Sequence, residues 1–220
     1  LGATWTTGGK YGNGLSFDGT SSRVDILNSS SLQLTSGMTL EAWVNPTNLT
    51  TDWQDIIYKG DRDYYLMASS SNGGSPVGGN TKGGVIGGAI GPTALPANTW
   101  SHLAATYNGQ NIVLYVNGVA VSSIQATGPI KTSVNPLQIG GDTLRGQYFK
   151  GLIDEVRIYG RALSQAEIQS DMSSAGDTTA PTISGVATSN LTAAGATVAW
   201  STSEAADSQV EYGTTTSYGS

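Results

Sequence analysis

The stretch from Gly151 to Ala162 constrains the fold of this chain most strongly. Its sequence is GLIDEVRIYGRA. Apolar residues recur with the period-two spacing of a half-buried strand, at Leu152 or Ile153, at Val156 and at Ile158. One acid, Asp154, is set into this strand, and its neighbour Glu155 is expected to face the other way. The pattern predicts a strand that carries a single carboxylate toward one side of a sheet.

A short helix is expected directly after this strand. Ser164 is a good N-cap residue, and Glu167 three positions later completes a capping box. The predicted helix covers 165–172 and is the only helix that the periodicity supports.

The rest of the chain indicates an all-β, antiparallel two-sheet sandwich. Turn residues recur about every ten positions, as in sandwiches. Asn117-Gly118, between two apolar runs, is typical of a two-residue type I′ hairpin. The glycine-rich segment from Ser69 to about Gly84 is expected to be a loop. The predicted strands cover 15–18, 23–26, 38–44, 56–58, 64–68, 100–107, 111–116, 119–125, 137–140 and 149–159.

Composition excludes several classes of protein. Lys and Arg total 10 against 16 acids, for a net charge of −6, so no basic surface is available for nucleic acid. No segment approaches the ~20 apolar residues of a membrane span, so membrane insertion is not expected. Cysteine is absent, which rules out disulfides and thiolate metal sites.

The composition changes after the predicted helix. Residues 173–181 are small and polar and end in Pro181, as a linker does. A second β pattern starts at Ile183. We therefore expect a sandwich domain over 1–172, a linker over 173–181 and a partial second β-sandwich over 182–220.

Five stretches of the first domain stand in a recognisable order. They are 12–19 (GNGLSFDG), 39–46 (TLEAWVNP), 100–107 (WSHLAATY), 114–118 (LYVNG) and the strand around Asp154. Together they resemble the laminin G-like jelly rolls of secreted bacterial and archaeal proteins. This resemblance implies a concanavalin A-like sandwich, here without the family's usual first strand, and a microbial protein that is secreted or at the cell surface.

The segment from Asp177 resembles the start of a fibronectin type III-like domain. Its marks are the stretches 178–181 (TTAP), 196–200 (ATVAW) and 208–213 (SQVEYG). Only the first few strands of such a domain are present. The chain is therefore interpreted as a piece excised from a larger multidomain protein.

The laminin G-like resemblance also implies a structural calcium site. In such domains the acid after the Phe17-type residue and the acid of the last strand lie close together. Transferred to this chain, the ligands are the carboxylates of Asp18 and Asp154 with turn oxygens at Gly19 and Ser21, the hard oxygen donors that calcium prefers. The alternative is that Asp18 only caps its turn and Asp154 accepts backbone hydrogen bonds.

Two groups of residues are candidates for ligand binding. Glu41 and Trp43 share one face of a strand and form a sugar platform if that face is open; otherwise Trp43 is buried, the more usual place for tryptophan. The second group lies in or beside loops at one rim, where recognition residues are common. Its members are Trp53, Tyr58, Asp61, Tyr64 and Tyr148.

No catalytic residues are predicted. His102 is the only histidine and lies within a strand, where we expect a structural role. No nucleophile elbow accompanies it, and no two acids alternate along one strand as in a retaining glucanase.

The leading hypothesis is a non-catalytic binding or adhesion module with a polysaccharide or glycan as its ligand. The alternative is a structural link of a surface fibre or stalk, in which neighbouring domains or copies of the chain are the partners. A glycan-active enzyme is the third hypothesis.

Overall fold

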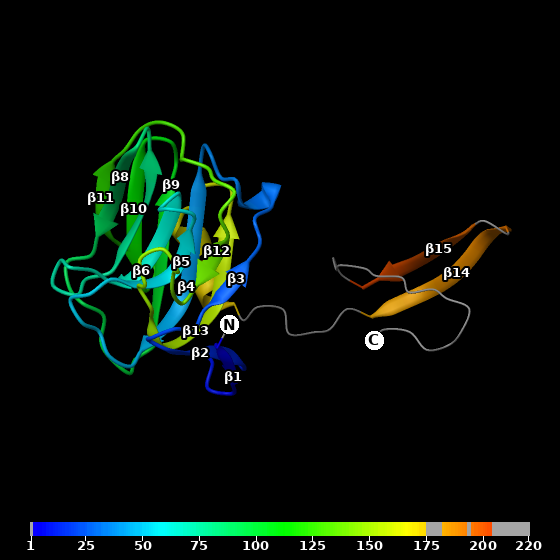
Figure 1. Ribbon diagram of the computed structural model, residues 1–220, viewed down its shortest axis with the longest axis horizontal. Coiled ribbons are helices and arrows are strands. Elements are labelled where there is room, and N and C mark those ends of the chain that lie inside the picture. The colour runs from blue at the N-terminus through cyan, green and yellow to red at the C-terminus, as the bar shows by residue number, and fades with distance from the viewer. Residues whose placement is uncertain (1, 175–181, 193–194, 204–220) are drawn as a thin grey trace. The chain divides into compact units, whose positions relative to one another are not determined.

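The chain folds into two separate units. A computed structural model describes residues 2–174, 182–192 and 195–203 (Figure 1). The units are Leu1–Gly176 and Asp177–Ser220.

The first unit is a sandwich of two antiparallel sheets, as the sequence predicts. One sheet has seven strands, in the order β1 (Thr4–Thr6), β2 (Gly14–Asp18), β13 (Lys150–Tyr159), β4 (Met38–Pro46), β9 (Ser101–Tyr107), β10 (Asn111–Val116) and β11 (Val119–Gln125). The other has six, in the order β3 (Val24–Ile26), β12 (Leu137–Ile139), β5 (Gln54–Lys59), β6 (Tyr64–Ser69), β7 (Val77–Lys82) and β8 (Val85–Ile90).

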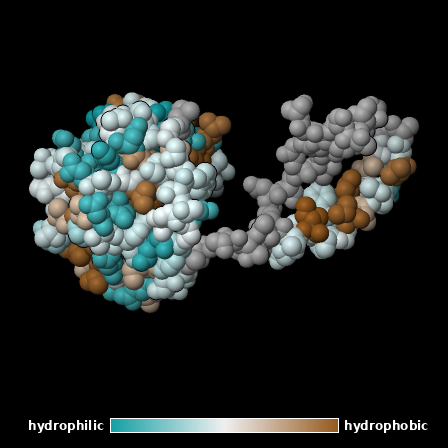
Figure 2. All heavy atoms as spheres, turned by 90° about the horizontal axis from the view of Figure 1, so that it is seen from below, coloured by the Kyte–Doolittle hydropathy of each residue, from teal (hydrophilic) through white to brown (hydrophobic). Residues whose placement is uncertain are grey.

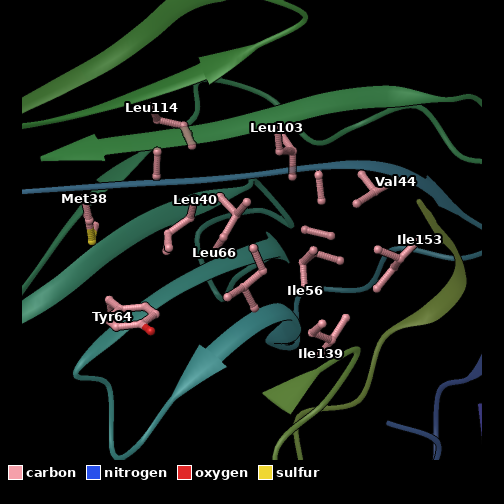
Figure 3. Close-up of a cluster of buried hydrophobic side chains, with 14 of the residues drawn as sticks. Met38, Leu40, Val44, Ile56, Tyr64, Leu66, Leu103, Leu114, Ile139 and Ile153 are labelled. Atoms are coloured by element: carbon pink, nitrogen blue, oxygen red, sulfur yellow. The ribbon is translucent and has the colours of Figure 1, made fainter. Parts of the chain in front are cut away.

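The main hydrophobic core lies between these sheets (Figure 3). The alternating apolar residues of β4 point into it, including Met38, Leu40 and Val44, all fully buried. Leu66 of β6 and Ile56 of β5 meet them from the six-stranded sheet. Burial of these side chains from both sheets supplies the main driving force for the sandwich.

A β-bulge in β13 resolves the ambiguity in the spacing of its apolar residues. The pairing with β4 shifts register between Asp154 and Arg157, and Glu155 has a φ of 51°. The extra residue lets Ile153 and Val156, three positions apart, both pack on the main core. Strict alternation, which the sequence predicts, therefore fails at Asp154 and Glu155.

Helix α1 (Gln165–Ser173) begins as predicted, with Ser164 and Glu167 forming both bonds of a capping box. It covers the outer face of the seven-stranded sheet. Its buried residue Ile168 packs with Ala104 and Tyr115 of that sheet. A 3-10 turn, η1 (Ser30–Leu32), lies between β3 and β4.

The prediction that the segment around Ser69–Gly84 is a loop is wrong over its second half. Strand β7 occupies this half and pairs with β6 on one side and, on the other, with β8, which follows Gly84. Its glycines are needed where backbones and side chains approach closely. A Cβ on Gly78 would lie 2.3 Å from the Ala105 Cβ, and one on Gly79 would lie 2.1 Å from the Gly87 carbonyl oxygen.

The described part of the second unit is a two-stranded sheet of β14 (Ile183–Thr192) and β15 (Gly195–Thr202). Apolar side chains of β14 are exposed, among them Ile183, Val186 and Leu191 (Figure 2). The stretches 178–181 and 208–213, which carry most of the fibronectin type III-like resemblance, lie outside the described residues. That resemblance stays a prediction.

On the visible face of the first unit, hydrophobic residues form only small, separate patches (Figure 2). Within the described residues, no helix combines the length and apolar character that crossing a bilayer requires.

Replacement of Gly78 by alanine tests the packing of β7. We expect Gly78→Ala to lower the free energy of unfolding by about 1–3 kcal/mol, because the new methyl group collides with Ala105. Gly87→Ala is the matched control on β8, since its Cβ meets nothing closer than 3.6 Å. Urea unfolding should show a lower midpoint for Gly78→Ala only. Equal midpoints would contradict this packing.

Candidate functional site

A pocket of about 460 Å³ opens beside the six-stranded sheet. Three segments that are distant in sequence line it. They are residues 48–54 between β4 and the start of β5, residues 145–150 before and at the start of β13, and Gly19 in the turn after β2. The volume lies in the range of small-ligand sites.

Two of the predicted rim aromatics meet in this pocket. Trp53 and Tyr148 both line it and both are half-buried. Trp53 also packs against an outer aromatic cluster made of Tyr58, Tyr65, Met67 and Val77. A Cβ on Gly141 would lie 2.3 Å from the Tyr148 ring, so the absence of a side chain there lets the ring settle against the backbone. Both rings therefore have fixed supports.

Two further predicted residues lie near the pocket without lining it. Tyr58 is fully buried in the outer aromatic cluster, and burial raises the pKa of its phenol. Asp61 forms an ion pair of 2.8 Å with Arg145, which holds the pKa of the Asp61 carboxyl below its usual range. The pair fastens the loop that carries Arg145 to the turn between β5 and β6.

The prediction that Tyr64 belongs to a ligand-binding rim is wrong. Tyr64 is 1% exposed and lies in the main core between the sheets (Figure 3). Its hydroxyl donates to the Leu32 carbonyl at 3.1 Å, and burial raises the pKa of the phenol. The preceding bulge in β5 and the alternation in β6 turn Tyr65, not Tyr64, toward the outer face.

The strand face that carries Glu41 and Trp43, a candidate sugar platform in the sequence, is also covered. Both lie on the outer face of the seven-stranded sheet, with exposures of 0% and 7%. The Trp43 indole nitrogen donates to the Met172 carbonyl at the end of α1, and Lys10 lies 4.2 Å above the indole ring. The helix end and the N-terminal turn cover the strand, so neither residue can offer a surface to a sugar.

Glu41 and His102 form a buried pair beneath α1. The His102 Nε2 and a Glu41 carboxylate oxygen are 3.8 Å apart, and both side chains are inaccessible to solvent. Burial raises the pKa of Glu41 to about 8, with a further contribution from Asp171. Burial lowers the pKa of His102 to about 4, with Arg157 adding to the effect. Both groups are therefore neutral at mildly acidic pH.

Two acids form another buried pair, outside the lining of the pocket, and the sequence pattern does not predict it. Asp55 and Asp142 are both 0% exposed. Burial, and then the charge of Asp142, hold the pKa of Asp55 well above its usual range. The signal for Asp55 is an acid next to the apolar run that begins at Ile56, but nothing in the sequence links it to a residue 87 positions away. Neither carboxylate lines the pocket.

The calcium ligands implied by resemblance do not come together. Asp18 is paired with Lys150 in the ladder, and Asp154 lies four residues further along β13. At about 3.3 Å per residue, the two acids are about 13 Å apart along the sheet. One ion cannot contact both carboxylates.

Each of these acids is already occupied by hydrogen-bond donors. Asp18 accepts from the backbone amides of Thr20, Ser21 and Ser22 at 2.8–3.0 Å, which holds the pKa of its carboxyl far below the usual range. Asp154 accepts from the Tyr11 and Glu155 amides, both at 2.9 Å. Amide hydrogens surround the oxygens that a cation would need, so these residues do not fit calcium. The other two predicted ligands have different roles. Gly19 lines the pocket, and the Ser21 hydroxyl donates a hydrogen bond to the Asp18 carboxylate.

The Glu41–His102 pair predicts a pH dependence of stability. The raised pKa of Glu41 adds stability that is complete below about pH 4.5 and is lost as pH rises toward 8. The lowered pKa of His102 removes stability as pH falls from 6.5 toward 4. Between pH 5 and 8, we expect the free energy of unfolding of the wild type to fall by at least about 1.4 kcal/mol, the equivalent of one pKa unit. Glu41→Gln should abolish this fall, and urea unfolding at a series of pH values measures it.

Asp52→Asn is the control for this measurement, because Asp52 is an exposed acid on the pocket rim. A Glu41→Gln protein with the same pH profile as the wild type would show that Glu41 is not the group responsible.

Three kinds of comparison relate this chain to known proteins. Human pappalysin-1 is 42% identical over 86 residues, which are 37% of this chain and 5% of pappalysin-1. The chain spans about 5% of the length of the curated relatives it matches.

Among solved structures, domain 4 of AbnA, a GH43 extracellular arabinanase from Geobacillus stearothermophilus, in complex with arabinotriose, has a TM-score of 0.63 and 23% identity. This match covers 78% of this chain and 82% of that domain. The binding domain of Paraclostridial Mosquitocidal Protein 1 has a TM-score of 0.64 and 18% identity, covering 78% of this chain and 45% of the other. These likenesses show a shared fold.

A family profile, Laminin_G_3, matches residues 18–169, which include most strands of both sheets. The matched region is well over half of the 220 residues. The chain therefore belongs to the concanavalin A-like lectin/glucanases superfamily.

Proposed function

We propose that the first unit is a non-catalytic, extracellular glycan-binding module whose ligand occupies the pocket beside Trp53 and Tyr148. The observation that carries this proposal is the convergence of these two aromatic rings with amide and hydroxyl side chains in one pocket. The first unit contributes three loops to it, and loops on a rigid sandwich are common recognition sites.

The chemistry of the pocket suits a sugar. A pyranose or furanose ring has apolar C–H faces and a rim of hydroxyl groups. Trp53 and Tyr148 supply rigid ring surfaces for the apolar faces. Asn48 and Thr50 line the same pocket and supply an amide and a hydroxyl group for hydrogen bonds with sugar hydroxyl groups.

The charges favour a neutral or weakly acidic glycan. Asp52, Arg145 and Lys150 are the charged residues that line the pocket. The Arg145 guanidinium is already paired with Asp61. The remaining charges are one acid and one base, which is too little for selection of a strongly anionic ligand.

The lining also supports a binding role rather than hydrolysis. Asp52 is the one carboxylate among the lining residues, and it is exposed. Glycosidases commonly use two carboxylates that flank the scissile bond. The arabinotriose complex of the AbnA domain adds support, since that domain has the same fold and belongs to an extracellular arabinanase.

Substitution of the pocket aromatics tests this function. We expect screening of the full chain on a glycan array, with arabinotriose and other neutral oligosaccharides, to give selective binding. Trp53→Ala and Tyr148→Ala should each weaken that binding at least about tenfold in isothermal titration calorimetry, because buried aromatic anchors carry much of the energy of such sites.

Trp5→Ala is the matched control for these variants. Trp5 is 76% exposed on β1 and does not line the pocket. Trp53→Phe keeps a ring at the rim and should retain part of the affinity. Binding that survives Trp53→Ala and Tyr148→Ala but is lost in Trp5→Ala would move the site elsewhere. Absence of binding across the array, together with self-association of the chain, would favour a structural link instead.

A further inference from the structure

Strand β8 forms an open edge of the six-stranded sheet. It pairs with β7 on one side and, within the described residues, with no strand on the other side. Its sequence is VIGGAI, and the side chains of Val85, Ile86 and Ile90 are 71%, 47% and 40% exposed. An apolar, uncharged edge strand of this kind is a template for pairing with another strand. The open side of β8 is therefore a candidate interaction surface.

The opposite edge of the sandwich is protected, and this edge is not. The strands at the opposite edge, β1 and β3, have only three residues each. Asp25 of β3 forms an ion pair with Arg23 at 3.0 Å. Short strands and charges are two ways in which proteins prevent edge pairing. Strand β11, which lies against β8 at the edge of the other sheet (Figure 1), is as long and uncharged as β8.

The hydrogen bond of Gly91 shows which backbone groups of β8 are free. The Gly91 amide donates to the Pro76 carbonyl at 2.8 Å, in the same register as the ladder between β8 and β7. Along a strand, the backbone groups of successive residues point to opposite sides. Every second residue before Gly91 therefore bonds toward β7. The amides and carbonyls of Ile86, Gly88 and Ile90 point to the open side.

The side chains of the same residues share the outer face of the sheet. A Cβ on Gly88 would lie 2.6 Å from the Tyr65 hydroxyl and 2.9 Å from the Val77 side chain, and both residues belong to the outer aromatic cluster. Side chains two positions apart in a strand lie on the same face. Ile86 and Ile90 therefore flank Gly88 on this outer face, with both isoleucines exposed.

The order of these residues makes β8 complementary to itself. Ile86, Gly88 and Ile90 give the same sequence in both directions. When two copies of β8 lie antiparallel and centred on Gly88, Ile86 of each copy is opposite Ile90 of the other. All three residues then form hydrogen-bonded pairs that exchange both backbone bonds. Any shifted register loses at least one of these pairs.

We propose that β8 is a homodimer interface, at which a second copy of this chain pairs its own β8 antiparallel to the first about a twofold axis at Gly88. The two six-stranded sheets then form one continuous sheet. The free backbone groups of both edges are bonded, and Ile86 of each copy packs against Ile90 of the other as a cross-strand pair. A twofold interface is closed, so it gives a dimer and no fibre.

The proposed dimer leaves the glycan pocket open. Gln54, which lines the pocket, belongs to β5, and β5 is three strands away from β8. At the usual spacing between strands this separation is about 14 Å. The interface is thus independent of glycan binding, and each dimer carries two separate pockets.

Sedimentation of the full chain tests the interface. The contact between two single strands is small, so we expect micromolar affinity. In analytical ultracentrifugation, the mass should rise with concentration from the 22.6 kDa of one chain to twice that value. Ile86→Lys should stay monomeric, because it places a charge at the paired edge. Leu27→Lys is the matched control, since Leu27 is 86% exposed directly after β3, at the opposite edge, and this variant should dimerise normally.

Three results of this measurement would overturn the proposal. The first is a wild type that stays monomeric up to millimolar concentration. The second is a dimer that persists in Ile86→Lys, because its contact then lies elsewhere. The third is growth into assemblies larger than a dimer, because a closed twofold interface does not allow it.

Cysteine cross-linking tests the register, and the chain has no cysteine of its own to interfere. In the proposed pairing, residues 86 and 90 of different copies have their Cα atoms about 5.5 Å apart, within the range of a disulfide. Residues 86 and 90 of one copy are about 13 Å apart, and the two copies of residue 86 are at least as far from each other.

The single variants Ile86→Cys and Ile90→Cys should therefore remain monomeric on non-reducing gels after mild oxidation. An equimolar mixture of the two should give a covalent dimer. This test also applies if Ile86→Lys fails to fold. Cross-linking of either single variant as fast as that of the mixture would overturn the register.

Glycan titration of Ile86→Lys keeps this proposal apart from the proposed function. A wild-type dimer that binds no glycan would support the interface and count only against the pocket. Glycan binding that needs Trp53, by a wild type that is monomeric at every concentration, would support the pocket and overturn the interface.

Discussion

The central strands of both sheets are buried on both faces, and the rest of the structure depends on this. Strands β4, β5, β6 and β9 are buried along nearly their whole length. One face of each strand forms the core between the sheets. Helix α1 covers the other face of the seven-stranded sheet. On the other face of the six-stranded sheet, Trp53 packs against the outer aromatic cluster, and the 141–148 loop is bonded to β5 by the Asp55 amide and the Gln147 carbonyl. A sandwich of this size therefore has three buried layers instead of one.

Polar residues on the outer faces are forced into burial by these covers. Glu41 and His102 lie under α1, and Asp55 and Asp142 lie at the 141–148 loop. Each pair contains an acid whose pKa burial raises, because the charged form loses its hydration. The pocket that we propose for glycans lies where one of these covers meets the loop before β5. The buried acids and the proposed binding site thus depend on the same covering segments.

Much of the fold was predictable because alternation is a local property. The pattern of Met38 to Val44 and the capping box at Ser164 both correspond to elements of the structure. Strands β7 and β8 were missed because their glycines remove the apolar signal, although close packing is what requires them. The alternation of apolar and polar residues along a strand also does not show whether the outer face of the sheet is covered. For this reason the sequence leaves Trp43 as a candidate for an exposed site.

The candidate site was harder to predict, because it depends on contacts between distant segments. Trp53 and Tyr148 are 95 positions apart in the sequence, and both were identified only as loop aromatics. Their meeting follows from the pairing of β12 with β5, which carries the 141–148 loop across to the loop that precedes β5. Asp18 and Asp154 are the opposite case. They lie on adjacent strands, but the register of β2 and β13 keeps the two carboxylates apart, and a resemblance to a family does not give that register.

The hydrogen bonds of Tyr11 have a mechanical consequence. Its amide donates to Asp154 and its hydroxyl to the Met172 carbonyl, both at 2.9 Å. The first dozen residues are thus tied to the last strand and to the end of the helix that closes the sandwich. A pulling force applied across these two segments would load this clasp at the edge before it reached the core.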